Sequence, residues 1–344
     1  MTTMTEILRL RSFVERNGAI ILSSSIVADG HYDGATARVV THIHNDHTRY
    51  LSRSARAGQL LVATPLTIEL LEAHGHRLPL HRRIEASYGT RMRIEDYVVT
   101  LHRANHVPGA AEVVVEHPEG LRVGYTGDFK LPGTVVLQDL DVLVIDATYG
   151  KPEWRRPWQD EIEYLLADIV NEALMHGPVR IYAYNGKIEE VMILLRRMGV
   201  TAPFVLPAKK KRVVEVLERH GYRLGDFVVE SSPECFEVKR GGWYIAFEHF
   251  FRWRRRHLAG PNGAVNILLS GWEFGSPYRR VGPRDWIVSF SDHADFTQLV
   301  EYVEEARPRL LVVDSSRGGE AAQVFASYVS RELGINAFYQ PRES

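Results

Sequence analysis

The stretch VVTHIHNDHTRYL, residues 39–51, holds three histidines and one aspartate within six positions, directly after an apolar run that is typical of a strand end. If residues 36–42 form a strand, His42 and His44 project to one side of the extended chain. Asp46 and His47 then follow where the chain turns toward a helix. Imidazole and carboxylate together suit a first-row dication such as zinc. The loop is therefore predicted to form half of a two-metal site.

Four ligands from one loop cannot saturate two ions, so further ligands are expected elsewhere in the chain. His106 precedes a Pro-Gly turn in RANHVPGA, and Asp128 follows a strand in VGYTGDFK. His293 lies at a strand-to-helix junction in FSDHADF. These three residues are the candidates for completing the site.

The bulk composition is that of an ordinary globular protein, with 344 residues, 45% hydrophobic side chains and a net charge of −1. Such a balance provides no overall basic field, so contact with a polyanion must come from local patches. The single cysteine, Cys235, excludes an internal disulfide and favours a reducing compartment. No stretch has the apolar length of a signal peptide or a membrane span, so we expect a cytoplasmic protein without a membrane partner.

The strand pattern changes along the chain. Short β-branched runs fill the sequence up to about residue 150, strands alternate with helices from about residue 158, and a strand-then-helix pattern returns near the C-terminus. This order predicts an α/β protein in which a first domain is interrupted by an inserted α/β domain with parallel strands. The predicted boundaries are 1–157 and 276–344 for the two parts of the first domain and 158–275 for the insert.

Several short segments carry residues suited to phosphate or base contact. Gly186 and Lys187 lie at a strand-to-helix turn, where amides and a lysine can meet a phosphate, although a plain helix start fits the same letters. The run KKKR at 209–212 fits a solvated helix face or a nucleic-acid contact. In FFRWRRRH, arginines interleave with aromatic residues, as in surfaces that pair phosphates and stack bases. The predicted basic contacts are Lys187, Arg155, Arg156, Arg252 and Arg254, with Gly186 as an amide donor.

The order HIHNDH, NHVPGA, YTGDF, VIDATYG, YNGK and SFSDHAD over residues 29–315 resembles the metallo-β-lactamase superfamily and its β-CASP nucleic-acid-processing branch. The resemblance implies a four-layer αββα sandwich with an inserted β-CASP domain. It also implies two divalent metal ions, zinc first and manganese or magnesium as alternatives. The implied metal ligands are His42, His44 and His106 for one ion, Asp46, His47 and His293 for the other, and Asp128 as the bridge.

Further roles are predicted for residues of this site. Two such ions suit phosphodiester hydrolysis, in which Asp46 would position the attacking water or take its proton. His293, Asp146 or a metal-bound water would provide a proton for the leaving oxygen. The resemblance implies that Asp146 would also orient a ligand. Asp29 matches a structural aspartate that steadies the ligand loop, and Asp33 is the weaker candidate for that place.

The substrate is predicted less directly. The letters ANHVPGA and the aspartate at 146 are similar to the Artemis-like DNA nucleases, and YGKPEWRRPW is similar to bacterial exonucleases associated with DNA ligase. Asp314 stands where RNA-processing members have histidine and DNA-acting members valine, so it follows neither pattern. An acid there would repel phosphate unless Arg317 pairs with it. Ser315 and Arg317 are also candidates for binding a terminal 5′-phosphate.

Four functions are compatible with these letters. The first is a metal-dependent DNA nuclease that works as an exonuclease from a 5′ end, in repair or end processing. Endonuclease activity is an additional mode. The second is an RNA-processing β-CASP ribonuclease. The third is a non-catalytic nucleic-acid-binding subunit, which the complete ligand set disfavours. The fourth is a small-molecule hydrolase, which shares the ligand loop but needs neither the insert nor Gly186 and Lys187.

Overall fold

The computed structural model describes residues 12–258 and 263–342. These residues form two compact units, one from the residues up to Arg155 together with those from Asp292 onward, and one from Arg156 to Ser291. The first unit is thus discontinuous in sequence, and the second is inserted into it. This arrangement agrees with the predicted insertion of an α/β domain.

The first sheet of the first unit follows the chain order. Among the described residues it has five strands, paired in the order β1-β2-β3-β4-β5. The β1–β2 pair is antiparallel and the other pairs are parallel. The bounds are β1 Ile20–Ile21, β2 Ile26–Ala28, β3 Ala37–Val39, β4 Leu60–Ala63 and β5 Arg83–Glu85.

The second sheet joins the two sequence parts of the first unit. Within the described residues its order is β19-β18-β10-β9-β8-β7-β6. The pairing of β10 with β18 is parallel and brings Val144 opposite Val312. The bounds are β6 Arg91–Ile94, β7 Tyr97–Arg103, β8 Ala111–Glu116, β9 Arg122–Tyr125, β10 Val142–Ile145, β18 Leu310–Asp314 and β19 Ala337–Gln340.

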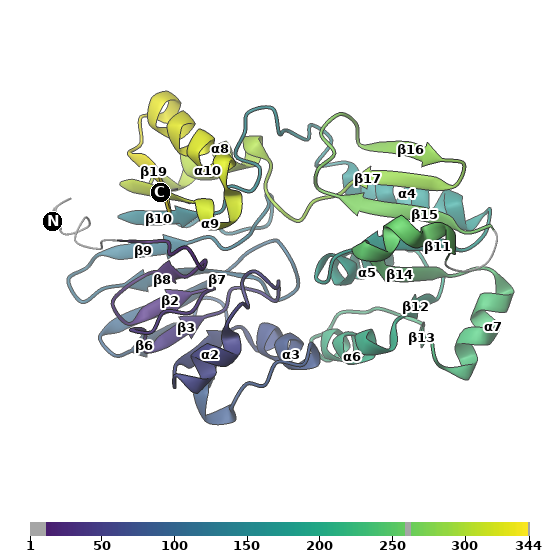
Figure 1. Ribbon diagram of the computed structural model, residues 1–344, viewed down its shortest axis with the longest axis horizontal. Coiled ribbons are helices and arrows are strands. Elements are labelled where there is room, and N and C mark those ends of the chain that lie inside the picture. The colour runs from purple at the N-terminus through teal and green to yellow at the C-terminus, as the bar shows by residue number, and fades with distance from the viewer. Residues whose placement is uncertain (1–11, 259–262, 343–344) are drawn as a thin grey trace. The chain divides into compact units, whose positions relative to one another are not determined.

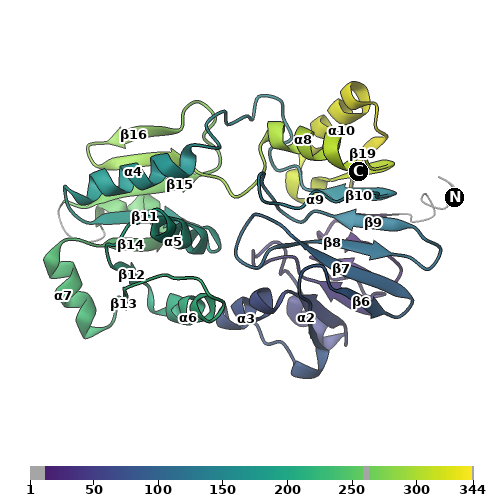
Figure 2. The same ribbon diagram turned by 180° about the vertical axis from the view of Figure 1, so that it is seen from behind.

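The core of this unit lies between the two sheets. One cluster of buried side chains includes Val39 and Val62 from the first sheet and Val113, Val144 and Val312 from the second. Alternate residues along each strand point to opposite faces, so the other face of each sheet needs a cover. Figures 1 and 2 show that helices provide it, with α2 and α3 beside the first sheet and α8 and α10 beside the second. The predicted four-layer αββα arrangement is confirmed.

The helices of the first unit are short and have ordinary starts. Thr64 accepts a hydrogen bond from the Thr67 amide at the start of α3, and Asp295 accepts one from the Gln298 amide at the start of α8. The bounds are α2 Leu51–Arg56, α3 Pro65–Ala73, η1 Leu80–Arg82, α8 Phe296–Ala306, α9 Ser315–Gly318, α10 Glu320–Tyr328 and η4 Val329–Leu333.

The second unit contains one sheet, ordered β13-β12-β14-β11-β15-β17-β16 in the described part of the chain. Its pairs are parallel except for the antiparallel β16–β17 hairpin. The strands are β11 Val179–Ala183, β12 Phe204–Leu206, β13 Phe227–Val229, β14 Ile245–His249, β15 Val265–Ser270, β16 Tyr278–Gly282 and β17 Asp285–Ser289. The helices are α4 Ile162–Leu174, α5 Lys187–Arg197, η2 Ala208–Lys210, α6 Lys211–Arg219, α7 Pro233–Gly241 and η3 Phe250–Leu258.

The second boundary of the insert differs from the prediction. The sequence pattern put it between residues 275 and 276, whereas the compact unit extends to Ser291. The reason is that β17 pairs in parallel with β15 and β16 pairs with β17, so both strands belong to the inserted sheet.

No helix within the described ranges combines the length and the apolar character needed to cross a lipid bilayer.

Candidate metal centre

The ligand loop follows β3 directly and is folded back on itself. The His47 and Thr48 amides both donate to the carbonyl of His44, at 3.1 and 3.0 Å. This tight turn brings Asp46 and His47 beside His42 rather than leaving them further along an extended chain. Helix α2 begins at Leu51, after the last of these residues.

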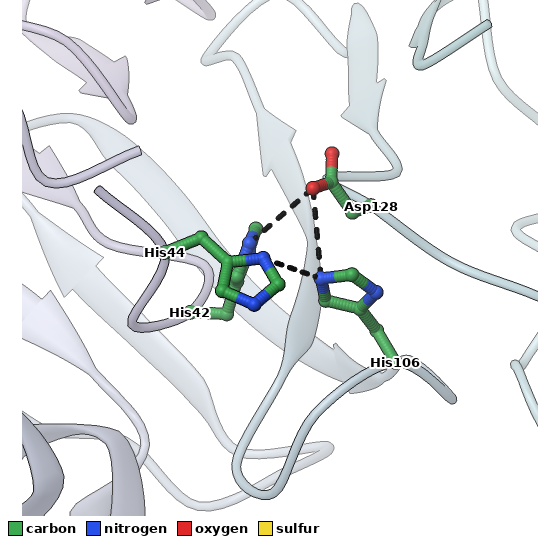
Figure 3. Close-up of side chains that lie close together, drawn as sticks. All are labelled: His42, His44, His106 and Asp128. Atoms are coloured by element: carbon green, nitrogen blue, oxygen red, sulfur yellow. Dashed lines mark hydrogen bonds and ion pairs between the residues drawn. The ribbon is translucent and has the colours of Figure 1, made fainter. Parts of the chain in front are cut away.

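Asp128 lies at the centre of the histidine cluster. Its Oδ2 atom is 3.3 Å from the Nε2 atom of His42, 3.2 Å from that of His47, 3.5 Å from that of His106 and 3.8 Å from that of His293. Figure 3 shows His42 and His106 directed at Asp128, with His44 against His106. The rings of His42, His47, His106 and His293 come from three distant parts of the sequence. Each of them thus directs its Nε2 atom toward the Oδ2 atom of Asp128.

The opposite nitrogen of each of these rings contacts an oxygen outside the cluster. Such contacts fix the tautomer and the orientation of a ligating imidazole. The Nδ1 partners are the Thr41 hydroxyl for His42 at 3.0 Å, Asp29 for His47 at 2.7 Å, the Asp292 carbonyl for His106 at 2.7 Å and Asp146 for His293 at 3.1 Å. When Nδ1 donates its proton outward, Nε2 presents a lone pair to Asp128.

Lone pairs that face a carboxylate repel it unless a cation lies between them. Within the described residues, the buried Nε2 atoms of His42 and His47 and the Oδ1 atom of Asp128 have no hydrogen-bond partner. Buried polar atoms without partners are costly, and a metal ion would satisfy them. One ligand atom each from His42, His44, His106 and Asp128 lies within 4.8 Å of the others. This donor set fits a divalent cation.

The residues predicted for the second ion contact the same Asp128 oxygen or lie beside it. His47 and His293 contact it as described, and the Asp46 Oδ2 atom is 3.4 Å from the Nε2 atom of His47. The Asp46 side chain is 48% exposed, whereas Asp128 is 3% exposed. Asp46 is therefore much more open to solvent than Asp128.

The charges in the cluster shift several pKa values strongly. Burial lowers the pKa of His42 to about 4, aided by the neighbouring charge of His47. Burial also lowers the pKa of His106 well below its usual value. Burial acts to lower the pKa of His293, but the charges of Asp128 and Asp146 outweigh it and raise this pKa to about 10. The cluster therefore favours a mixture of neutral and cationic rings around its acids.

The carboxylates respond to the same charges. Burial acts to raise the pKa of Asp128, but His47 and His293 bring it well below the usual range. Burial likewise opposes ionisation of Asp46, and His47 lowers its pKa below the usual value. Asp146 differs because burial dominates and raises its pKa. Asp128 and Asp46 thus favour the anionic form, while Asp146 is the acid of the cluster that more readily holds a proton.

Asp29 occupies the place that the resemblance gave it. Its carboxylate accepts hydrogen bonds from the Thr41 amide at 2.8 Å, the Thr41 hydroxyl at 2.6 Å and His47 Nδ1 at 2.7 Å. Its backbone has a φ of 54°, in the left-handed region that aspartate tolerates better than most residues. Asp33, the weaker candidate, instead contacts His31 and Arg53, and its side chain is 74% exposed.

Asp292 was missed by the sequence reasoning. Its carbonyl accepts the hydrogen bond from His106, and a ligand-type atom of its side chain lies within 4.8 Å of those of His106 and His293. The signal was present in the sequence, because Asp292-His293 repeats the Asp-His pair of Asp46-His47. Arg38 was missed as well. This fully buried residue donates to the His47 carbonyl at 2.9 Å and so holds the ligand loop.

A cavity of about 370 Å³ opens beside the cluster, and Asp46, Asp128 and His293 line it together with three arginines. The arginines are Arg16, Arg49 and Arg317. Arg16 and Arg49 form no ion pair within the part of the chain that the structure describes. The cavity thus combines side chains of the kind that bind metals with cationic groups suited to an anionic ligand.

Asp314 and Arg317 form a buried pair at the wall of this cavity. Arg317 Nη1 donates to Asp314 Oδ2 at 2.7 Å, and the two side chains are 8% and 1% exposed. Asp314 Oδ1 accepts from the amide and hydroxyl of Ser316 at 2.8 and 2.6 Å. The acid that the sequence could not place is therefore neutralised. The neighbouring Ser315 hydroxyl donates to the Pro341 carbonyl at 2.5 Å, so it is already engaged.

Arg155 and Arg156 have different environments. Arg155 is exposed, and its guanidinium lies 4.9 Å from the centre of the Phe296 ring. Arg156 is 1% exposed and donates to the Gly271 carbonyl at 2.8 Å, which favours a structural role over phosphate contact.

The predicted contacts of the second unit are also partly engaged. The Gly186 amide donates to the Glu189 carboxylate at 2.7 Å, and Lys187, 7% exposed, donates to the Phe290 carbonyl at 3.3 Å. Arg252 pairs with Glu248 at 2.8 Å, while its side chain remains 60% exposed. Arg254 is exposed and forms no ion pair with the described residues.

Comparisons with known proteins connect these observations to sequence relatives. No protein-family profile matches the chain. An uncharacterized protein from the lig 3′ region of Acidianus ambivalens is 51% identical over 137 residues, which are 39% of this chain and 97% of that protein. A probable DNA ligase of Opitutus terrae is 26% identical over 87% of this chain, and 5′ exonuclease Apollo of Gallus gallus is 25% identical over 91%.

The relatives also include an enzyme named for RNA. A probable RNase MJ4 of Methanocaldococcus jannaschii is 24% identical over 78% of this chain and 72% of that protein. The chain spans only 28% of the Opitutus protein and 66% of the Apollo protein. Among solved structures, a protein of unknown function from Enterococcus faecalis has the same fold, with a TM-score of 0.62 at 13% identity over 88% of this chain and 91% of that one.

The sandwich, the ligand loop after β3 and these relatives define a class of metal-binding α/β proteins. The chain belongs to the metallo-β-lactamase superfamily, in the β-CASP branch, whose inserted domain is the second unit.

Proposed function

We propose that this protein is a metal-dependent nuclease that hydrolyses phosphodiester bonds of DNA, working from a 5′ end in repair or end processing. The observation that carries the proposal is the convergence of His42, His47, His106 and His293 on Asp128 beside a cavity lined by arginines. Endonuclease activity would be an additional mode of the same site.

Two divalent ions fit the donor set, with zinc expected first because three neutral imidazoles and a carboxylate suit it. His42, His44 and His106 would hold one ion, Asp46, His47 and His293 the other, and Asp128 both. When bound, such ions lower the pKa of a water molecule and neutralise charge on phosphate oxygens. We propose zinc as the metal used in the cell, with manganese or magnesium as the alternatives.

The protein side chains have separate tasks in this reaction. Asp46, exposed to the cavity and ionised because His47 lowers its pKa, can position a water molecule and accept its proton. Asp146 and His293 share a contact of 3.1 Å between Oδ2 and Nδ1, and a proton held there can pass to the leaving oxygen. Arg16 and Arg49, which are exposed at the cavity wall, can pair with phosphate oxygens, whereas Arg317 is already paired with Asp314.

The preference for DNA rests on sequence relatives. The Apollo protein is a 5′ exonuclease by name, and the Opitutus protein is a probable DNA ligase. The RNase relative supports a second candidate, an RNA-processing nuclease built on the same site. A non-catalytic subunit is disfavoured because the sequence contains the whole predicted ligand set. A cytoplasmic location is proposed as well, since Cys235 is buried and unpaired.

The decisive experiment uses 5′-labelled, 5′-phosphorylated single-stranded DNA and RNA of one sequence, incubated with zinc- or manganese-loaded protein and resolved on a denaturing gel. DNA products that shorten stepwise from the 5′ end are expected. Cleavage of RNA alone would transfer the proposal to the second candidate, and cleavage by protein stripped of dications would overturn the metal-dependent mechanism.

Site variants provide the control. Asp46→Ala and His47→Ala should each lower the rate by more than about 100-fold while the protein stays folded, because each removes a ligand and Asp46 also handles a proton. His176→Ala, which alters an exposed histidine outside the cluster, should keep the wild-type rate. Activity retained by both site variants would contradict the assigned roles.

A further inference from the structure

An exposed group of aromatic side chains lies where β11 and β14 end. Tyr184 follows β11 directly, His249 is the last residue of β14, and Phe250 and Phe251 begin η3. The two strands are parallel neighbours, with Ala183 opposite His249. Their carboxyl ends therefore bring the four rings together, at the edge of an open parallel sheet where ligands commonly bind.

The four rings are packed against one another, one pair stacked and the others tilted or edge to face. The Tyr184 and Phe250 ring centres are 4.6 Å apart with an interplanar angle of 17°. His249 and Phe251 follow at 5.1 Å and 36°. Phe250 packs against a buried cluster that includes Tyr182 and Leu268, so the stack rests on the core of the unit. We call Tyr184, His249, Phe250 and Phe251 the aromatic platform.

The platform remains open to solvent. Tyr184 is 45% exposed and Phe251 is 75% exposed. Large apolar side chains that gather on a surface indicate a binding site more often than isolated ones do. Because Phe250 packs against the buried cluster, the Tyr184 ring stacked on it is held in place before any ligand binds.

The charges around the platform are cationic. Lys209 lies close enough to contribute to a lowered pKa of His249, after burial. Lys209, Arg254 and Arg255 are exposed and form no ion pair with any described residue. The nearby acid Glu248 is already paired with Arg252 at 2.8 Å. The surface thus offers positive charge beside aromatic faces.

The loops that present these groups are tied to each other. Glu189 accepts a hydrogen bond from the Gly186 amide at 2.7 Å, and Lys210 forms a buried ion pair with the same carboxylate. The loop after β11, which carries Tyr184, is thereby fastened to the loop after β12, which carries Lys209. Two segments that looked independent in the sequence form one surface.

We propose that the aromatic platform binds single-stranded nucleic acid by stacking its bases on Tyr184 and Phe251, while Lys209, Arg254 and Arg255 contact the phosphates. This inference rests on the proposed nuclease function and adds a second contact region to it. Stacking is tolerant of base identity because every base has a flat face, so the platform grips a strand without selecting a sequence.

The test measures binding by the full-length protein in chelator, where no strand is cut. The probes are 5′-phosphorylated single-stranded DNA and the same strand with a run of abasic positions. Wild-type protein should bind the normal strand more tightly than the abasic strand. Tyr184→Ala and Phe251→Ala should each weaken binding of the normal strand by about tenfold and shrink the difference between the two strands.

Matched variants make the result specific. Tyr164→Ala and Phe236→Ala remove exposed rings elsewhere on the same unit, 63% and 69% exposed, and should leave binding unchanged. Tyr184→Phe keeps the ring and should restore wild-type binding. Because Phe251 is largely exposed, Phe251→Ala should fold normally even if Tyr184→Ala does not.

The failures of the two proposals can be told apart. If wild-type protein cuts DNA but binds normal and abasic strands equally, the platform is wrong and the nuclease proposal stands. If it neither binds nor cuts nucleic acid, the proposed function itself fails. Equal binding by Phe251→Ala and wild-type protein would also overturn the platform, and would leave its exposed rings as a surface for another class of partner.

Discussion

The Oδ2 atom of Asp29 lies 2.7 Å from the Nδ1 atom of His47, and both side chains are fully buried. Asp29 also receives two hydrogen bonds from Thr41, the residue before His42. One carboxylate therefore fixes both ends of the ligand loop. His47 reaches Asp128 with the correct nitrogen because Asp29 occupies the other one.

Replacing Asp29 with asparagine should weaken metal binding without unfolding the protein. The amide matches the carboxylate in shape but loses the charge that orients His47, and losses of this kind cost about 10- to 100-fold in metal affinity. Zinc competition against a chelator measures the change. Asp33→Asn is the control, because Asp33 is 74% exposed and pairs outside the site. Equal affinities for the two variants would contradict the role of Asp29.

Removing the Arg317 guanidinium should destabilise the protein strongly. Asp314 is 1% exposed, and without Arg317 its charge would be buried without a counterion. Breaking a buried pair from one side costs about 3–5 kcal/mol, so Arg317→Ala should lower the free energy of unfolding by that amount in urea titrations. Arg309→Ala breaks a pair whose arginine is 56% exposed, and it should cost less than about 1 kcal/mol.

Glu112 should make the protein less stable as the pH rises. Burial raises its pKa well above the ordinary value of 4.5, against the hydrogen bond that Tyr302 donates at 2.6 Å. A raised folded-state pKa gives stability that is complete below the unfolded value and is lost as pH climbs toward the folded one. Glu112→Gln should therefore be about 1–3 kcal/mol more stable than wild type at pH 8, with the gap shrinking toward pH 4.

Urea unfolding of both proteins across this pH range gives the comparison. A constant difference between Glu112→Gln and wild type, or one that grows on acidification, would refute the assignment of this pH dependence to Glu112. Tyr302→Phe offers a second check. It removes the hydrogen bond to the ionised form and should steepen the loss of stability at high pH.

Gly30 should not tolerate a side chain. A Cβ atom there would lie 2.2 Å from the Ala19 Cα atom, closer than any real contact, because the two backbones cross beside Asp29. Gly30→Ala should cost at least about 2 kcal/mol in thermal or urea unfolding. Gly241→Ala is the matched control, since a Cβ atom there meets nothing within 4 Å. It should be neutral or stabilise helix α7 by up to about 1 kcal/mol.

The sequence predicted the sandwich, the insertion and the cluster because each leaves a local signal. Strand periodicity reveals layers, and ligand residues beside Gly or Pro turns reveal a site. The roles of the individual ligands remain predictions. Asp292 was not predicted as a site residue because its backbone carbonyl, a group that every residue has, makes the contact to His106. The boundary was misplaced because β16 and β17 form a hairpin whose sheet is chosen by long-range pairing, which a local pattern does not show.

Whether a basic residue is available for phosphate contact was harder to predict from the sequence alone. Arg155 and Arg156 are adjacent in the sequence, yet the first is exposed and the second is among the most buried large side chains of the protein. The difference arises from tertiary packing against Gly271 and Phe274. Conversely, Arg16 and Arg49 stood in no basic run, and the fold alone brings them to the cavity.

The ligands are divided between segments that lie on either side of the insert, with His42 to Asp128 before it and His293 after it. During synthesis on a ribosome, the first six imidazole and carboxylate groups of the predicted cluster emerge before the second unit, and His293 emerges only after it. The histidine cluster is consequently completed late, after the whole second unit has been synthesised. A ribosome-bound intermediate would therefore hold a cluster without its last histidine until the second unit had been synthesised.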